Sequence, residues 1–422
     1  MENGDVPRFP LRTRTHPGWV VLAALCCVGF ARQGPAVATL SIFVEPLTRE
    51  FGWSRAALSG AVSLGGVLAA LVSPLIGPLL DRHGSRVVLC AAVLVNAAAL
   101  VLLSFTPSLL VFYLLFCIAR MKWAVPFDLG IYGALANRFV ARRAFATSVA
   151  TMAQMAGLVA MPLIAQFAIV HDGWRAGWLA LGIVTLVVGF VPVWLFIEGR
   201  AQDRGPAGAA GPEPSFSRQQ ALGTPAFWLL LLYTVLVYPV QAGVSLHQAP
   251  HLVERGIDAT AAALIVSSFS FMSGVGTLAC GFLPRRLPIR FAMALAGALL
   301  ALGAWLMARI ATPADGTLAA AAFGLGIGGV LTLLPVAWAD YFGRANYGAI
   351  RGLALSAQVL AQAAGPLLSG ALRDFTGDYL LSLQFFGVLS VLSVVAALAA
   401  RPPRRRSFQS VSYTHLTLPT KA

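Results

Sequence analysis

The chain repeats itself at a constant spacing of 204 residues, as from Pro46 to Pro250. The other identical pairs at this spacing are Glu50 and Glu254, Gly52 and Gly256, Gly77 and Gly281, Arg86 and Arg290, Ala153-Gln154 and Ala357-Gln358, Pro162-Leu163 and Pro366-Leu367, and Gly173 and Gly377. Chance matches of glycine or alanine would scatter over many spacings. A repeat of about half the chain predicts two halves that share one fold.

The composition predicts that both halves lie in a membrane. Of the 422 residues, 58% are hydrophobic and 11% are charged, whereas a soluble domain has about 25% charged residues. A membrane-spanning helix needs roughly 20 apolar residues. Twelve such stretches are expected, at 18–43, 56–80, 86–105, 108–135, 145–170, 174–197, 226–248, 259–283, 289–310, 316–339, 351–372 and 379–400.

The basic residues predict an orientation. The terminal arms and the even-numbered connections hold 21 Lys and Arg residues, against 6 on the other side. Loops rich in Lys and Arg stay in the cytoplasm, so both termini are expected there, in a multi-pass protein of the cell inner (plasma) membrane. The net charge of +14 then suits anionic lipid, and no nucleic-acid partner is expected.

The same pattern predicts the domain organisation. Residues 1–17 form a cytoplasmic arm, 18–197 the first six-helix bundle and 226–400 the second. Between them, residues 198–225 contain nine Gly or Pro in 28 positions, which is typical of a flexible linker. Residues 401–422 form a cytoplasmic tail. From Ser407 its composition departs from the rest, so the end of the chain is interpreted as partly non-native.

One motif stands between the second and third apolar segments. The stretch from Gly77 to Arg86 reads GPLLDRHGSR and resembles the G-x-L-x-D-R-x-G-R-R/K signature of the major facilitator superfamily. An ordinary charged turn is the alternative, but a second copy without the Asp follows at residues 281–290. The gating motif comprises Gly77, Asp81, Arg82, Gly84 and Arg86.

Chemistry and resemblance together assign this motif a role. Asp81 is expected to accept hydrogen bonds from a neighbouring helix N-terminus, where a carboxylate is favoured. Arg86 and the basic cluster Arg138, Arg142 and Arg143 are expected to pair with it. The resemblance implies a latch that holds the cytoplasmic side shut in one state.

Other segments resemble a narrower group. They are FGWSRA at 51–56, NRFVARRA at 137–144, Gly173-Trp174-Arg175 and Gly365-Pro366. All are similar to bacterial transporters related to the monocarboxylate transporters and the oxalate/formate antiporters. The resemblance implies a carrier for small organic anions, often coupled to protons. Those relatives usually carry a cation in helix 8, whereas residues 267–273 here read SSFSFMS, and helix 11 offers Gln358 and Gln362.

Charges within the spans provide the candidate site. Arg32 and Arg120 lie near the centres of the first and fourth apolar segments. Two guanidinium groups at one depth suit a carboxylate; the alternative is that each Arg snorkels or pairs structurally. Gln358 and Gln362 are added as substrate-binding candidates. Asp128 is the candidate for proton coupling, with a structural ion pair to Arg120 or Lys122 as the alternative.

These features predict an all-α transporter and exclude other classes. No G-x-x-x-x-G-K-[ST] loop for ATP and no HExxH, GxSxG or paired catalytic carboxylates occur, so neither an enzyme nor a cofactor or metal is expected. The predicted function is secondary transport of a small organic anion, a monocarboxylate or a related carboxylate, by alternating access with protons. The partners are this anion, protons and the lipid bilayer, and we expect a monomer. A drug or metabolite exporter and a non-transporting receptor remain alternatives.

Overall fold

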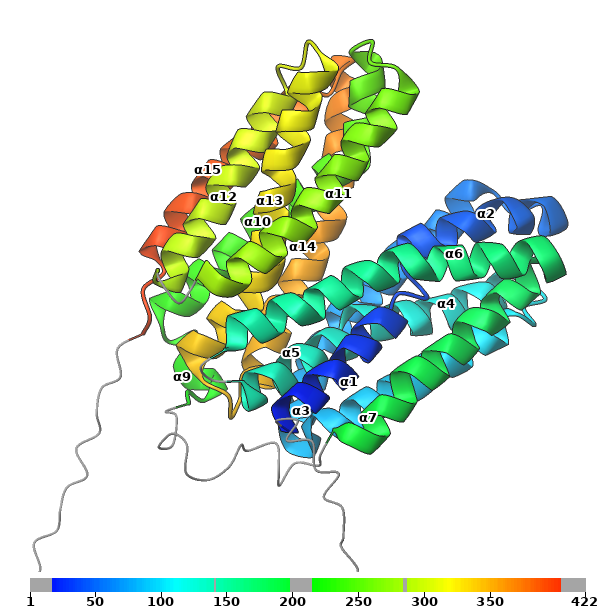
Figure 1. Ribbon diagram of the computed structural model, residues 1–422, viewed down its shortest axis with the longest axis horizontal. Coiled ribbons are helices and arrows are strands. Elements are labelled where there is room, and N and C mark those ends of the chain that lie inside the picture. Colours follow the sequence, from blue (N-terminus) through cyan, green and yellow to red (C-terminus); the bar gives the residue numbers. More distant parts are fainter. Residues whose placement is uncertain (1–16, 140–141, 198–214, 284–286, 404–422) are drawn as a thin grey trace, which may run out of the picture.

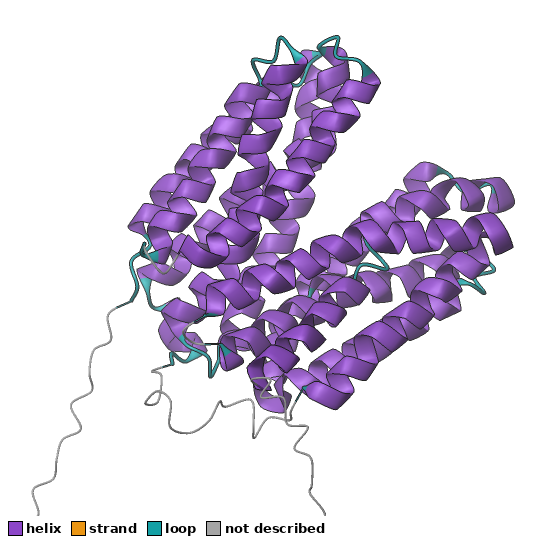
Figure 2. Cartoon of the chain, viewed as in Figure 1, coloured by secondary structure: helices purple, strands orange, loops and turns teal. Residues whose placement is uncertain are grey.

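All regular elements in the described part of the chain are helices (Figure 2). The computed structural model describes residues 17–139, 142–197, 215–283 and 287–403. The helices are α1 (Pro17–Ala31), α2 (Val37–Phe51), α3 (Arg55–Leu103), α4 (Leu109–Ala124), α5 (Pro126–Arg138), α6 (Arg143–Val184), the π-helix η1 (Thr185–Phe190), α7 (Val191–Phe196), α9 (Arg218–Leu222), α10 (Pro225–Glu254), α11 (Ala259–Phe282), α12 (Ile289–Met307), α13 (Pro313–Phe342), α14 (Tyr347–Thr376) and α15 (Leu380–Ala399).

Helix lengths account for twelve membrane crossings. Eight apolar helical stretches in the described residues are long enough to cross a membrane, and two of them contain 44 and 54 residues. At 1.5 Å per residue these two measure about 66 and 81 Å, more than twice a hydrocarbon core of about 30 Å. Each of these two stretches therefore crosses the membrane twice. The chain reverses direction at Gly84 in the first stretch and at Gly173 in the second, and both glycines have a φ of 81°. The α1–α2 pair and α14 complete the twelve.

The helices form two bundles that meet at one end. Figure 1 shows α1 to α7 in one bundle and α10 to α15 in the other, arranged as a V whose arms converge near α9. We call this end the α9 side. Contacts between the bundles involve mainly α3 with α14 and α6 with α11. The bundles diverge towards the opposite side.

The sequence repeat is also present in the backbone. Gly52 and Gly256 have φ values of 68° and 82°, and Gly173 and Gly377 have 81° and 86°. These left-handed conformations favour glycine, because a Cβ atom is strained there. Both glutamates of the repeat form an ion pair, Glu50 with Arg175 at 2.8 Å and Glu254 with Arg373 at 3.0 Å, although the two arginines are not at equivalent positions. The spacing of 204 residues therefore relates two structural copies.

Two predicted spans are interrupted. The first span, expected to run unbroken over 18–43, consists of α1 and α2 separated by residues 32–36. Gly34 and Pro35 lie in this break, and Pro35 lacks the N–H that a continuous helix requires. The fourth span ends its first helix at Ala124, and Pro126 begins the next one. Backbone groups at membrane depth are tolerated outside a regular helix only where protein or water contacts them.

Part of the predicted linker is ordered against the second bundle. Residues 198–214 lie outside the described residues, but α9 follows within the segment that we expected to be flexible. Ser217 and Gln220 form a capping box at its start. Phe216 N–H donates to the Phe342 carbonyl at 2.9 Å, and Asn346 Nδ2 donates to the Phe216 carbonyl at 2.8 Å. The segment expected to be a linker therefore includes one short helix that contacts the second bundle.

Small residues bring the bundles together on the α9 side. A Cβ atom at Gly77 of α3 would overlap the Gly348 carbonyl oxygen of α14. Nearby, Ser73 Oγ donates to the Gly352 carbonyl at 2.7 Å, and Ser356 Oγ donates to the Ala70 carbonyl at 2.7 Å. Small residues at helix contacts allow close packing where no water drives association.

Gly77→Ala should destabilise this arrangement, because the new methyl group meets backbone atoms that cannot rotate away. Overpacking of this kind costs roughly 1–3 kcal/mol. We expect a lower melting temperature of the purified protein, followed by intrinsic fluorescence. Gly370→Ala in α14 is the matched control, because nothing lies within 4 Å of the position that its new methyl group would occupy. Equal melting temperatures for the two variants would contradict the prediction.

Candidate functional site

The break in the first span positions Arg32. The residue follows α1 directly and is 6% exposed. Thr185 Oγ1 of η1 donates to the Ala31 carbonyl at 3.3 Å, and Thr39 Oγ1 donates to the Gln33 carbonyl at 2.9 Å. The Gln33 carbonyl also accepts from the Ala36 N–H at 3.1 Å, so the backbone of the break is held by its own turn and by both hydroxyl groups. Arg32 is therefore held in an ordered turn between two helices.

The structure brings Arg32 and Arg120 together around Trp123. The Cζ atom of Arg32 lies 5.0 Å from the centre of the Trp123 ring, and that of Arg120 lies 4.0 Å from it. The two guanidinium carbons are thus at most 9.0 Å apart, the sum of these distances. Trp123 Nε1 donates to Gln33 Oε1 at 2.9 Å, which joins α4 to the break. The sequence predicted both arginines as site residues but neither Trp123 nor Gln33.

A glycine makes room for Arg120. A Cβ atom at Gly65 of α3 would lie 2.8 Å from the Cβ and Cγ atoms of Arg120. The second and fourth spans therefore approach closely at the level of this side chain. This contact holds the stem of Arg120 against α3 while its guanidinium group lies over Trp123.

Both guanidinium groups have free hydrogen-bonding capacity. Nε and Nη1 of Arg32 and of Arg120 are buried without a hydrogen-bond partner among the described residues. An arginine at the centre of a membrane helix costs roughly 2.5–3.5 kcal/mol on insertion scales. A cation–π contact returns about 0.5–2 kcal/mol. The Trp123 face therefore offsets only part of the cost of burying the two guanidinium groups.

Asp128 has a different partner from the one predicted. Arg351 donates to Asp128 Oδ1 from Nη2 at 2.7 Å and from Nε at 3.3 Å. The predicted alternatives, Arg120 and Lys122, are therefore wrong as ion-pair partners. The prediction assumed a straight helix, whereas the span is interrupted between Ala124 and Pro126. Asp128 lies in α5 of one bundle and Arg351 in α14 of the other.

This ion pair is buried at the interface between the bundles. The Arg351 side chain is 2% exposed and that of Asp128 is 12% exposed. The sequence pattern groups Arg351 with the basic residues of the connections, and only the folded chain reveals its burial. The guanidinium carbon of Arg351 lies 5.5 Å from the centre of the Tyr132 ring. Arg32 interacts electrostatically with both members of the pair, so the ion pair is a neighbour of the arginine site.

A neutral polar network extends from the ion pair into the first bundle. Tyr132 Oη and Thr151 Oγ1 lie 3.2 Å apart, and Gln154 Nε2 donates to Tyr132 Oη at 3.2 Å. All three side chains are buried. Gln154 therefore joins α6 to α5 within one bundle.

The predicted glutamines lie in the second bundle. Gln362 Nε2 donates to Gln241 Oε1 at 3.1 Å, which connects α14 to α10. Gln358, one turn earlier on α14, is partly buried and has no hydrogen bond to the described residues. The structure places neither glutamine in contact with Arg32 or Arg120. Their role in substrate binding stays a prediction.

The gating motif contacts the opposite bundle through Asp81. Its Oδ1 accepts from the Gly348 N–H at 2.8 Å, and its Oδ2 accepts from the Ala349 N–H at 2.7 Å. This is the contact with a helix N-terminus that the sequence predicts, and the helix is α14. Arg82 is exposed. The function of the motif as a gate stays a prediction.

The basic residues near the motif have other partners. Arg86 Nη2 donates to the Trp194 carbonyl at 2.8 Å, and its guanidinium carbon lies 4.7 Å from the ring centre. Arg143 pairs with Asp340 of α13, and Arg344 Nη1 donates to the Asn137 carbonyl at 3.0 Å. The last two contacts join the bundles on the α9 side. The α9 side is therefore closed by charged groups as well as by small residues.

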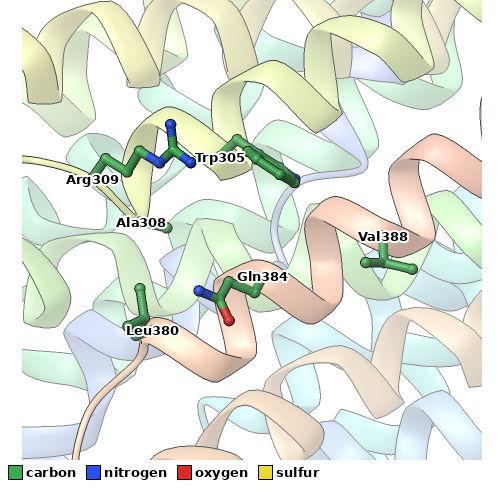
Figure 3. Close-up of a pocket in the computed structure, with 6 residues that line it drawn as sticks. All are labelled: Trp305, Ala308, Arg309, Leu380, Gln384 and Val388. Carbon is green, nitrogen blue, oxygen red and sulfur yellow. The ribbon is translucent and has the colours of Figure 1, made fainter.

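A separate cavity lies away from these groups (Figure 3). It measures about 310 Å³ and is lined by Trp305, Ala308, Arg309, Leu380, Gln384 and Val388 of the second bundle. Trp305 and Val388 are 49% and 53% exposed, as expected of side chains that face lipid. None of the predicted substrate-binding residues lines it.

The fold and the buried charges define a class of membrane transporters with two similar bundles. The Major Facilitator Superfamily profile matches residues 21–366 and 249–415, so the chain belongs to this superfamily. Monocarboxylate transporter 11 of Homo sapiens is 29% identical over 387 residues, which cover 88% of this chain and 80% of that protein. The chain is thus a superfamily transporter related to the monocarboxylate transporters.

Two further similarities differ in extent. The membrane sensor protein UhpC of Escherichia coli (strain K12) is 27% identical over 258 residues, 55% of this chain and 58% of that protein. Among solved structures, a bacterial homologue of the iron transporter ferroportin in an outward-facing state aligns with a TM-score of 0.71 and 18% identity. That alignment covers 91% of this chain and 98% of the other. At this identity it shows the fold alone.

Breaking the Asp128–Arg351 pair from one side should destabilise the protein. Arg351→Met leaves Asp128 without its partner, and truncating a buried pair costs roughly 3–5 kcal/mol. We expect a clear fall in melting temperature and in the yield of monodisperse protein. The double variant Asp128→Leu with Arg351→Met should recover most of the loss, because no isolated charge remains. A double variant no better than Arg351→Met would contradict the ion pair.

Proposed function

We propose that the chain is a secondary carrier that moves a small organic anion bearing a carboxylate across the plasma membrane by alternating access. The observation that carries this proposal is the pair of arginines at Trp123, whose buried nitrogens lack partners in the described structure. Guanidinium groups bind carboxylates through paired N–H donors. The name of the similar human protein, a monocarboxylate transporter, supports the same class of substrate.

The geometry supports an orientation and a state. Basic residues predict that the α9 side is cytoplasmic, with both termini there. The bundles meet on this side and diverge on the other (Figure 1), so the structure corresponds to a carrier open to the outside. Opening to the cytoplasm requires separation of Asp81 from α14, of Arg143 from Asp340 and of Asp128 from Arg351.

Asp128 supplies a route for proton coupling. A proton on its carboxylate removes the negative charge that faces Arg351. The ion pair then becomes a hydrogen bond between a neutral carboxylic acid and the guanidinium cation of Arg351, which is weaker than the ion pair and so weakens the contact between α5 and α14. Protonation would therefore favour separation of the bundles on the α9 side, and proton release would favour closure. Proton movement is in this way coupled to the conformational change through one contact.

A second candidate function is sensing. The partial similarity to the membrane sensor protein UhpC favours it, because a sensor of this fold can bind an anion without moving it. Binding alone does not separate the two functions. Uptake by the purified protein in proteoliposomes does, since a sensor would bind the anion and leave the vesicle interior empty.

Removing either arginine should weaken binding of the transported carboxylate. Arg32→Ala and Arg120→Ala should each lower affinity by about tenfold or more, one lost charged hydrogen bond being worth roughly 1.5–3 kcal/mol. Arg→Lys should rescue little, because lysine cannot offer the planar pair of donors. A panel of carboxylates is screened by calorimetry with the purified protein. Wild-type affinity in both alanine variants would overturn the assignment of the site.

Asp128→Asn should separate coupling from exchange. The amide stays polar but cannot release a proton, so accumulation driven by a pH gradient should disappear while exchange across proteoliposomes persists. Asp315→Asn is the control, because Asp315 caps α13 at an exposed position. Loss of folded protein in Asp128→Asn would favour a purely structural ion pair. Unchanged gradient-driven accumulation would exclude Asp128 as the coupling group.

A further inference from the structure

We infer that the substrate is a dicarboxylate, with one carboxylate at Arg32 and the other at Arg120. The inference rests on the proposed function, because it takes a carboxylate carrier as its starting point. It goes further by specifying the charge of the substrate. A singly charged anion balances the charge of one cationic side chain, and this site has two such side chains.

The charges of the described residues leave the two arginines with an excess of positive charge. Among the described residues, Asp128 is the acid that acts on Arg32, and both nitrogens recorded on its carboxylate belong to Arg351. The pair is neutral as a unit; its carboxylate offsets part of the Arg32 charge, and no acid of the described residues acts on Arg120. Lys122 lies two residues from Arg120 and so about 200° around the helix. Two positive charges therefore remain at Trp123.

The arginines have room and free donors for two carboxylates. Their guanidinium carbons lie 5.0 and 4.0 Å from the same indole ring centre, yet no acid lies between them in the described structure. Each keeps two buried nitrogens without a partner. A short dicarboxylate spans a separation of at most 9.0 Å with a carboxylate facing each cation. A single carboxylate would leave one positive charge uncompensated in a site of low dielectric constant.

The break in the first span adds donors next to Arg32. The amides of Val37 and Thr39 lie in the first turn of α2 and have no hydrogen-bond acceptor among the described residues. Ala36, the N-cap, provides no side-chain hydrogen bond. A helix N-terminus favours a negative charge. Because Arg32 is buried and unpartnered in the same turn, the amides and the guanidinium group form one region of positive potential.

The test compares anions that differ by one charge. Malonate, succinate and glutarate are each measured against their monomethyl esters, with propionate as a simple monocarboxylate. Binding to the purified full chain at neutral pH is followed by calorimetry. We expect one diacid to bind about tenfold or more tightly than its own half ester. The paired esters keep chain length nearly constant, so the ratio reports the second charge.

Substitutions at single residues identify the side chain that binds the second carboxylate. Arg120→Gln should reduce the diacid-to-ester ratio to about one while leaving the half ester bound at Arg32. Arg120→Lys keeps the positive charge and should retain a ratio above that of Arg120→Gln. Lys122→Gln is the matched control and should keep the wild-type ratio. Melting temperatures check that each variant is folded.

The outcomes separate the inference from the proposed function. If half esters or propionate bind as tightly as the diacids, the dicarboxylate inference is wrong and a monocarboxylate carrier stands. If no carboxylate of the panel binds the folded wild-type protein, the proposed carboxylate function fails with it. A diacid preference that survives Arg120→Gln would overturn the assignment of the second charge to Arg120.

Discussion

A bilayer offers no water to peptide groups, so every backbone N–H and C=O at membrane depth needs a partner within the protein. Helices satisfy this requirement internally, and the described structure has no other regular element. The first span departs from it at residues 32–36. Two hydroxyl groups, Thr185 and Thr39, occupy carbonyls around the break. The amides that begin α2 stay available, so the interrupted region near Arg32 is also one that can receive a ligand.

Two arrangements lower the free energy of charged side chains that are buried in the membrane. On the α9 side, Asp128 with Arg351 and Arg143 with Asp340 pair opposite charges from different bundles. Such contacts are lost when the bundles separate, so they depend on conformation. At Trp123, by contrast, Arg32 and Arg120 lie within one bundle and contact an aromatic face. Because both arginines belong to one bundle, their arrangement does not change when the bundles move. A bound anion would balance their charge.

Sequence patterns predicted the fold because its determinants are periodic. The 204-residue repeat and the apolar stretches suffice for two helical bundles, and the location of Arg32 and Arg120 at membrane depth follows from their place within the spans. Interactions between residues that are far apart in the sequence could not be predicted in this way. Arg351 lies near the start of its helix, so its position resembled that of a loop cation, and only the crossing of α14 with α5 buries it.

Some of the features that were not predicted correspond to a recognisable sequence pattern, and others do not. Gly34-Pro35 in the first span indicates a helix interruption, but the apolar character of the stretch favoured a continuous helix. Trp123 adjoins the predicted charges, yet nothing local indicates that its ring would contact both arginines. Helix α9 lies next to a Gly- and Pro-rich segment, and its order depends on contacts with Phe342 and Asn346.

The placement of both arginines in one bundle has an electrical consequence. An empty site carries two positive charges, whereas a site filled by a doubly charged anion is neutral. Reorientation of the loaded carrier is then insensitive to voltage, and reorientation of the empty carrier moves charge, at about 2.3 kcal/mol per elementary charge for each 100 mV crossed. For such an anion moving alone, an inside-negative potential assists export and opposes uptake. Protons that accompany the anion cancel this opposition.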